Sequence, residues 1–199
     1  GTIFEELIRK FNEANNEEAG EHYTPRDVVE LMADLVFMPV KDQIKDATYS
    51  CYDGACGTGG MLTVAQDRLL ELAEETGKQV SIHLFGQELQ PETYAICKAD
   101  MLLKGDGKQA EHISYGSTLS MDGNASRQFD FMLSNPPYGK TWKVDAEKMG
   151  GKKDILDSRF NAYLEDGTQL SMIPRVNDGQ LLFMLNNVAK MKTDTPLGS

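Results

Sequence analysis

Residues 47–60 read ATYSCYDGACGTGG, and a stretch with apolar residues at helical spacing follows at 61–76. The first six residues predict a short strand that runs up to Asp53, and the second stretch predicts a helix. Glycines between a strand and a helix let the backbone approach a ligand, and the first turn of the helix offers free N–H groups. These residues therefore predict a nucleotide-type site.

The rest of the chain continues to alternate between strand-like and helix-like patterns. We expect helices at 2–14, 25–36, 91–104 and 179–192, strands at 80–85, 112–115 and 129–133, and irregular chain at 139–178. Thr24 is expected to cap the helix that it precedes. The alternation predicts an α/β fold with a doubly wound, mainly parallel sheet and right-handed crossovers.

Polar residues follow four of the predicted strands, namely Asp53, Glu88, Ser117 and Asn135. Ligands of such sheets bind at the carboxyl ends of the strands, so we expect these side chains to meet at one rim. An acidic residue after the second strand can accept hydrogen bonds from ribose hydroxyls. The separation of Asp53 and Glu88 exceeds the dinucleotide-type spacing of about 20 residues, and GxGxxG is absent. A nucleoside ligand is therefore favoured over a dinucleotide.

The strand at 129–133 leads into NPPY (135–138). Two consecutive prolines lack N–H groups and cannot continue a ladder, and a residue before proline is held extended. The Asn135 amide oxygen and the Pro136 carbonyl form a pair of acceptors that can hold a planar NH2 group. Tyr138 can stack on the ring that carries the amine. This corner predicts a site that grips an amine.

The whole chain of 199 residues is acidic, with 20 Lys and Arg against 31 Asp and Glu and a net charge of −11. This balance argues against a free-standing protein that binds nucleic acid through bulk charge, although a partner subunit could supply a cationic surface. Length and composition predict one soluble globular domain. The 3 Cys and 3 His are scattered, so we expect neither a disulfide framework nor a metal site. No apolar run or signal segment is found, so we expect a cytoplasmic protein without a membrane segment.

Residues 139–160 are positive within this acidic chain. The segment follows NPPY directly, and two interpretations of its charge stay open: a solvated loop, or a contact with phosphates. GKT (139–141) resembles the end of a phosphate loop, but Ser134 stands where that loop requires glycine, which disfavours an ATP site. The basic residues of the segment are Lys140, Lys143, Lys148, Lys152, Lys153 and Arg159, against Asp145, Glu147, Asp154 and Asp157.

Four motifs follow one another along the chain: HYTPR (22–26), DGACGTGG (53–60), GQE (86–88) and NPPY (135–138). In this order they resemble the class I methyltransferases that methylate adenine N6 in DNA. The chain is most similar to the methylation (M) subunit of type I restriction-modification systems. ETYAICKADMLLKG (92–105) and DGQLLFMLNNVAKMK (178–192) extend the resemblance over essentially the whole chain.

The resemblance implies a Rossmann-like class I methyltransferase fold, with S-adenosylmethionine as the cofactor. It assigns a catalytic corner to Asn135, Pro136, Pro137 and Tyr138, with Asn135 also bordering the cofactor. It implies that the cofactor is held by His22, Tyr23, Thr24, Pro25, Arg26, Asp53, Gly57, Thr58, Gly59, Gly60, Glu88 and Ser117. Asp53 and the glycines would hold the methionine end and Glu88 the ribose. Ser117 stands where the family often carries an acidic residue near the adenine ring.

The implied reaction transfers a methyl group to the N6 amine of an adenine that is flipped out of double-stranded DNA. The implied partners are this DNA, a specificity subunit and a restriction subunit. Two alternatives remain: an N-methyltransferase of protein glutamine or RNA, since both use NPPY, and a cofactor-binding fragment that is inactive without partners. Such enzymes have more strands than the four expected here, so we expect a fragment truncated at its C-terminus. Its parts would be helices with a cofactor-bordering motif (1–46), the cofactor and NPPY core (47–138), and a loop with a helix (139–199).

Overall fold

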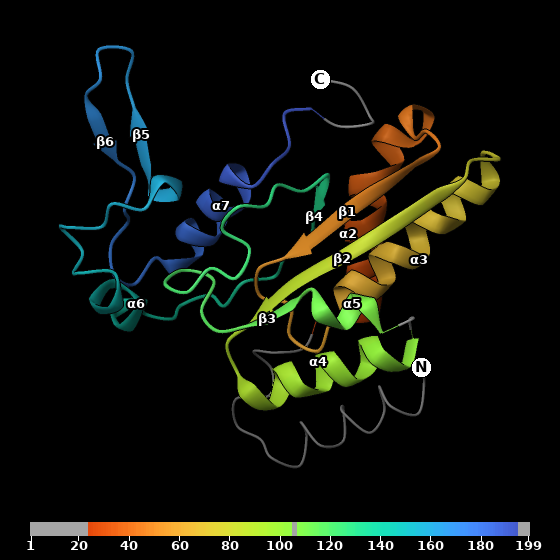
Figure 1. Cartoon of the computed structure of the whole chain (residues 1–199), viewed down its shortest axis with the longest axis horizontal. Helices are drawn as coiled ribbons and strands as arrows, with labels where there is room; N and C mark the ends of the chain where they lie inside the picture. Colours follow the sequence, from red (N-terminus) through yellow and green to blue (C-terminus); the bar gives the residue numbers. More distant parts are fainter. Residues whose placement is uncertain (1–23, 105–106, 195–199) are drawn as a thin grey trace.

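The computed structural model describes residues 24–104 and 107–194 (Figure 1). The helix expected at 2–14 and the site residues His22 and Tyr23 lie outside these ranges. The helices and strands, with η marking a 3-10 helix, are α2 (Arg26–Phe37), η2 (Met38–Gln43), β1 (Ala47–Asp53), α3 (Gly60–Glu75), β2 (Val80–Glu88), α4 (Pro91–Lys104), α5 (Lys108–Glu111), β3 (Ile113–Tyr115), β4 (Phe131–Met132), α6 (Lys143–Lys148), η3 (Ser158–Phe160), β5 (Asn161–Tyr163), β6 (Gln169–Ser171) and α7 (Gly179–Ala189).

The main sheet has four parallel strands in the order β3-β2-β1-β4. β1 and β2 pair from Ala47 with Val80 to Asp53 with Gly86, so both strands reach the same rim. The chain steps outward from β1 to β3 and then returns to the free side of β1 as β4. This reversal confirms the doubly wound, mainly parallel sheet that the alternation predicts.

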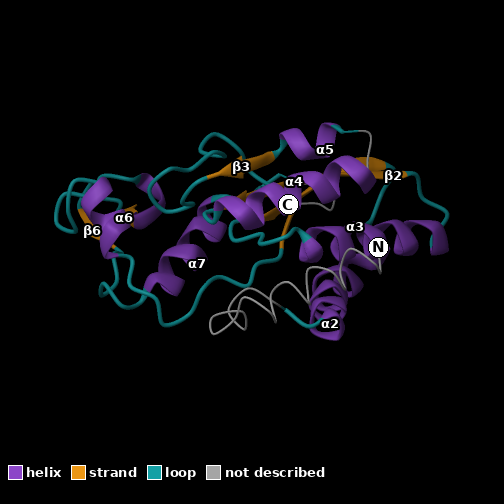
Figure 2. Cartoon of the chain, turned by 90° about the horizontal axis from the view of Figure 1, so that it is seen from below, coloured by secondary structure: helices purple, strands orange, loops and turns teal. Residues whose placement is uncertain are grey.

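The main core lies between the sheet and its helices. Figure 2 shows α3 lying between the strands and α2. Phe37 of α2, Leu62 and Leu69 of α3, and Leu84 of β2 are fully or almost fully buried there. The ring of Phe37 meets Phe131 of β4 edge-on at 4.8 Å between centroids. Each such buried side chain contributes roughly 1.5–3 kcal/mol, so this core holds the rim in a fixed geometry.

The chain at 139–178 is not irregular, which corrects the expectation from sequence. It contains α6, η3 and the antiparallel hairpin β5–β6, which projects away from the main sheet (Figure 1). Trp142, Ile155 and Phe160 are buried in a second, smaller core together with Leu119 and Leu182. These apolar residues are too widely and unevenly spaced to give a periodic signal, so sequence patterns could not reveal the core.

Two predicted boundaries near β4 are also wrong, and both have one cause. β4 spans only Phe131–Met132, because Phe129 pairs in parallel with Met191 instead of with β1. Phe129 N donates to the Lys190 carbonyl at 2.8 Å, and Lys192 N donates to the Phe129 carbonyl at 3.1 Å. The chain must leave the helix to make these bonds, so α7 ends at Ala189 rather than at residue 192.

Thr24 does not cap α2. The cap residue is Pro25, without a side-chain hydrogen bond to the helix, and the Thr24 hydroxyl has another partner described below. Across residues 24–104 and 107–194, we find no helix of the length and apolarity that crossing a bilayer requires.

Candidate functional site

The glycine-rich turn after β1 depends on backbone conformations that favour glycine. Gly57 has φ 56° and Gly59 has φ 84°, both in the left-handed region. A Cβ on Gly59 would also lie 2.8 Å from both Cys97 Sγ and Met101 Cε of α4. A Cβ on Gly60 would touch nothing within 4 Å. Gly59 therefore lets the turn pack on α4, whereas Gly60 leaves open space at the start of α3.

Glu88 ties the end of β2 to this turn. Gly57 N donates to Glu88 Oε2 at 2.9 Å, and Gln90 N donates to Oε1 at 2.7 Å. The side chain is almost buried, with 9% of the residue exposed. Each carboxylate oxygen has a further lone pair, so Glu88 can shape the turn and still accept hydrogen bonds from a ligand.

Asp53 lies at the rim with only 2% of its surface exposed. Its Oδ1 accepts a hydrogen bond from Ala55 N at 2.9 Å. Burial raises the pKa of Asp53 to about 7, and Glu88 adds to the shift, while the Ala55 N–H and the nearby Ser134 hydroxyl oppose it. A buried carboxyl that titrates near neutrality suits a cationic ligand, which would draw it into its ionised form.

Ser117 is buried in the loop after β3, and this loop is fastened to the rim. Gly116 N donates to the Glu88 carbonyl at 2.9 Å, and the Thr118 hydroxyl donates to the Gly54 carbonyl in the glycine-rich turn. The Ser117 hydroxyl accepts from Leu119 N at 3.2 Å. The structure thus brings Ser117 close to the elements that carry Glu88 and Asp53.

Gln87 is a functional candidate that sequence reasoning missed. Its fully buried amide donates to the carbonyls of Gly116 (3.1 Å) and Met121 (2.8 Å) and accepts from Gly123 N at 3.1 Å. It therefore holds both ends of the loop that contains Ser117. In the sequence, Gln87 is marked only by its position between Gly86 and Glu88 in GQE. This position does not predict contacts with a loop about 30 residues further along the chain.

The NPPY corner lies beside the end of β1, because Leu133 N donates to the Tyr52 carbonyl at 3.2 Å. Asn135 Nδ2 donates to the Thr24 hydroxyl at 3.1 Å, which joins the TPR and NPPY motifs. Within residues 24–104 and 107–194, no hydrogen bond reaches Asn135 Oδ1 or the Pro136 carbonyl. Tyr138 is 68% exposed. The corner therefore presents two acceptors that no described residue uses, and an accessible ring.

Asp130 is not part of this corner. Its Oδ2 accepts from Ser50 N (2.8 Å), from the Ser50 hydroxyl (2.6 Å) and from Lys192 Nζ (2.7 Å). These contacts join Ser50 of β1 to Asp130, just before β4, and to Lys192, after α7. Asp130 is therefore structural, as its early position on the strand indicates.

Arg26 and Gly60 line a common cavity of about 370 Å³ with Thr63 and Lys104, so two further predicted site residues lie together. Arg26 also pairs with Glu30 at 3.0 Å.

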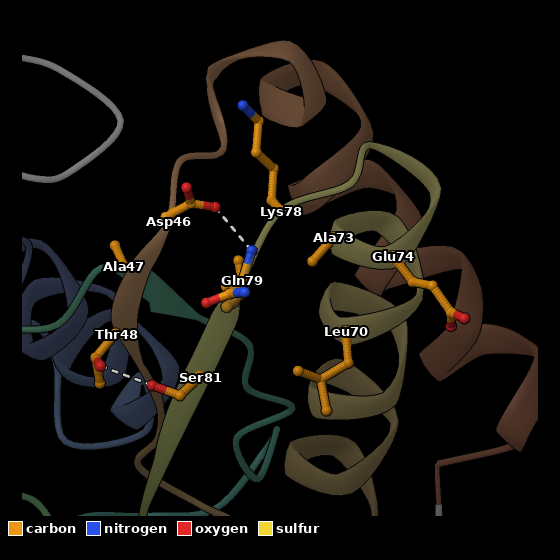
Figure 3. A pocket seen from close by; sticks show the side chains of 10 residues that line it. Asp46, Ala47, Thr48, Leu70, Ala73, Glu74, Lys78, Gln79 and Ser81 are labelled. Atoms are coloured by element: carbon orange, nitrogen blue, oxygen red, sulfur yellow. Dashed lines mark hydrogen bonds between the residues drawn. The ribbon is translucent and has the colours of Figure 1, made fainter.

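A larger pocket of about 740 Å³ lies at the other end of the sheet, near the starts of β1 and β2 (Figure 3). Its walls include Asp46, Thr48, Lys78 and Ser81, and the Thr48 and Ser81 hydroxyls are 2.6 Å apart. None of the predicted site residues lines it. The candidate site is therefore the rim at the carboxyl ends of the strands, not the larger pocket.

The structure resembles that of the type I restriction-modification system methyltransferase subunit from Streptococcus thermophilus, with a TM-score of 0.61 over 86% of this chain and 24% identity. The fold is thus that of the class I methyltransferases. The family model of N-6 DNA Methylase matches residues 1–195, and the chain belongs to this family.

Two curated relatives are similar over most of the chain. The type I restriction enzyme MjaIX methylase subunit of Methanocaldococcus jannaschii is 29% identical over 81% of this chain, and the EcoEI methylase subunit of Escherichia coli is 31% identical over 74%. The matches cover 28% and 29% of those two proteins and 32% of the Streptococcus thermophilus chain. The chain therefore spans less than a third of the length of these relatives.

Proposed function

We propose that this chain carries the methyl-transfer site of a type I modification subunit, and that it methylates adenine N6 in double-stranded DNA. One observation carries the proposal: the Asn135 corner is bonded to Thr24 and lies beside the strand that ends at Asp53. The amine site and the cofactor site would then share one rim. Membership of the N-6 DNA Methylase family and the names of both curated relatives support this reaction.

The residues at the rim fit S-adenosylmethionine as the cofactor. A buried carboxyl at Asp53 complements the cationic methionine end, Glu88 retains lone pairs for ribose hydroxyls, and the space beside Gly60 at the start of α3 is open. The bound cofactor supplies an activated methyl group. The remaining predicted contacts, from Thr24–Arg26, Gly57, Thr58, Gly60, Ser117 and Asn135, are part of the same proposal.

The protein's task would be to position and polarise the amine. The lone pair of an adenine amine is delocalised into the ring, which makes the nitrogen a poor nucleophile. Acceptors at Asn135 Oδ1 and the Pro136 carbonyl would draw both N–H bonds toward them and favour a pyramidal nitrogen. The base must leave the duplex to reach this corner, at a cost of a few kcal/mol that stacking on Tyr138 partly offsets. Pro137 keeps the corner rigid.

We assign residues 47–138 to the cofactor and amine core, with 24–46 bordering it. Residues 139–194 would then support it through the second core. Type I relatives suggest a specificity subunit and a restriction subunit as partners. Target recognition by a specificity subunit would reconcile the net charge of −11 with a DNA substrate.

The test is methyl transfer from labelled cofactor by the full-length protein, with DNA, protein and RNA as acceptors. Label in N6-methyladenine, increasing when a specificity subunit is added, is the expected result. Label in protein or RNA would instead favour the alternative substrates. Tight cofactor binding without transfer to any acceptor would reject the catalytic proposal.

We expect cofactor affinity to increase as the pH rises from about 6 to about 8. Asp53 has a pKa raised by burial to about 7, so it is largely protonated at the lower pH, and only its ionised form attracts a cation. Calorimetry in buffers of different ionisation enthalpy should also detect proton release on binding. Asp53→Asn, which can still accept from Ala55 N, should bind weakly at both pH values. A pH-independent wild type would contradict this role.

The Asp53 carboxyl gives the stability of the free protein the opposite pH dependence: stability falls as the pH rises. A folded pKa near 7 against an ordinary value of 3.8 means that the native state holds a proton that the unfolded state releases. The resulting stabilisation is full in acid and is lost as the pH rises from 3.8 to about 7. Asp53→Asn should therefore not lower the Tm of the free protein above neutral pH, which separates its binding defect from misfolding.

The lysines after NPPY are candidates for DNA phosphate contacts. The structure removes Arg159 from the six basic residues of this segment. The five lysines of the segment are exposed, whereas Arg159 is 11% exposed at its side chain and bound internally. Asp145 accepts from the Ser120 hydroxyl at 2.6 Å, so part of the acidic charge is turned inward. Of the four acidic residues only Glu147 and Asp154 are exposed, so the exposed charge is positive and we favour the phosphate contact over the solvated loop.

We expect Lys152→Glu with Lys153→Glu to weaken DNA binding and to reduce its salt dependence. Each lost phosphate contact should lower the slope of log K against log salt by about 0.9. Binding measured across a salt series tests this. The matched control is Lys45→Glu with Lys78→Glu, which reverses the charge of two exposed lysines at the opposite end of the sheet. Equal losses in both variants would indicate only a change in net charge.

A further inference from the structure

Arg159 lies after the NPPY corner in sequence, yet its side chain reaches the loop that follows β3. Its Nη1 donates to the Thr118 carbonyl at 2.7 Å, and its Nη2 donates to the Leu119 carbonyl at 2.9 Å. A third bond, from Nη1 to Asn186 Oδ1 of α7 at 2.9 Å, fixes the guanidinium from the other side. One planar side chain therefore holds two successive carbonyls of one loop.

The charge of Arg159 is balanced inside the protein. Its Nη2 lies 2.6 Å from Asp157 Oδ2, and its Nη1 lies 3.2 Å from Asp122 Oδ2. Asp122 is also 2.7 Å from Lys190 Nζ, and all these side chains are largely buried. A lysine at position 159 would keep the positive charge but could not direct fixed donors at both carbonyls and at Asn186.

The loop that Arg159 holds is part of the candidate site. Ser117 precedes the two carbonyls, and the Thr118 hydroxyl donates to the Gly54 carbonyl in the glycine-rich turn. Two contacts thus lead from Arg159 to the turn that follows Asp53. No contact of Arg159 with the NPPY corner is found in the part of the chain that the structure describes.

We propose that Arg159 is a positioning residue for the cofactor site. It holds Thr118 and Leu119 in place, and through them it sets the position of Ser117 and of the Gly54 carbonyl. The inference rests on the proposed function, because it assigns the cofactor to this rim. It assigns Arg159 to cofactor binding and not to DNA contact, although the residue belongs to the basic segment after NPPY.

The test measures the dissociation constant for S-adenosylmethionine, kcat and Tm in the full-length protein. Arg159→Lys should weaken cofactor binding about 10-fold, since charged hydrogen bonds to the loop are lost. Its kcat at saturating cofactor should change little, because the amine corner is not attached to Arg159. The control is Arg68→Lys, which disturbs more exposed pairs with Asp34 of α2 (2.6 Å) and with Glu71 of its own helix α3 (2.6 Å). It should leave cofactor affinity unchanged and change Tm only slightly, because exposed ion pairs contribute little to stability.

A double-mutant cycle with Thr118→Val tests the route of the effect. If Arg159 acts through Thr118, the double variant should bind S-adenosylmethionine about 10-fold more weakly than wild type. Two independent effects would instead multiply to a loss of affinity of roughly 100-fold. Independent losses, or an Arg159→Lys variant that loses Tm but keeps its affinity, would overturn the inference. Should Arg159→Lys not fold, unchanged affinity in Thr118→Val alone would overturn it. A wild type that binds no cofactor would overturn the proposed function as well, whereas equal binding by wild type and Arg159→Lys refutes only the role of Arg159.

Discussion

Asn135→Ala is expected to reduce the rate of methyl transfer by about 100- to 1000-fold, the loss typical when an oriented dipole at the reacting centre is removed. The side chain is held by its bond to Thr24, with the Oδ1 acceptor unused by any residue that the structure describes. Alanine removes this acceptor and leaves the Pro136 carbonyl alone. Because the cofactor's proposed main contacts come from other strand ends, its dissociation constant should stay nearly unchanged.

Single-turnover transfer and calorimetry on the same preparation measure the two effects separately. Asn177→Ala, at an exposed asparagine outside the site, is the matched control and should behave as wild type. Thr24→Val should give a transfer rate between those of wild type and Asn135→Ala, because it keeps both acceptors but removes the partner that orients the amide. Wild-type turnover in Asn135→Ala would contradict the role of the corner.

Glu88→Ala is expected to raise the dissociation constant for S-adenosylmethionine about 100-fold, through the loss of charged hydrogen bonds to the ligand and to the turn. The two carboxylate oxygens hold Gly57 N and Gln90 N, so the same substitution removes the proposed ribose acceptor and loosens the glycine-rich turn. At saturating cofactor the transfer rate should recover, since the amine corner is intact.

Titration calorimetry and the dependence of rate on cofactor concentration test this split. Glu111→Ala, on the exposed side of α5, removes a carboxylate of the same kind away from the rim and should leave affinity unchanged. An unaltered dissociation constant in Glu88→Ala would remove Glu88 from the cofactor site. A fall in kcat that saturating cofactor does not restore would point to damage beyond that site.

The units β1–α3–β2 and α4 could be predicted from sequence because each is long and strongly periodic. The rim followed from them, since parallel strands end on the same side. The contacts that complete the site could not be predicted. Thr24 and Asn135 are 111 residues apart, and Arg159 and Thr118 are 41 apart. Local patterns carry no information on such pairs, and a polar residue that binds a distant carbonyl has the same sequence signal as a solvated one.

The misassigned residues have the same explanation. Thr24 has every local feature of a helix cap, but a tertiary partner takes its hydroxyl. Arg159 stands among exposed lysines, yet Phe160 beside it is drawn into the second core and brings the guanidinium inside. For Thr24, the long-range contact outweighs a local capping preference of about 1 kcal/mol.

The bond between Thr24 and Asn135 has a consequence for how the molecule folds. Contacts between residues far apart in sequence form slowly, because the chain must first lose the entropy of closing the loop between them. The β1–α3–β2 unit closes a shorter loop, because Thr48 and Ser81 on its paired strands are 33 residues apart, against 111 for Thr24 and Asn135. During refolding, amides of this unit should gain protection from hydrogen exchange before the NPPY corner does, so the part proposed to hold the methyl donor would form before the part proposed to receive the base.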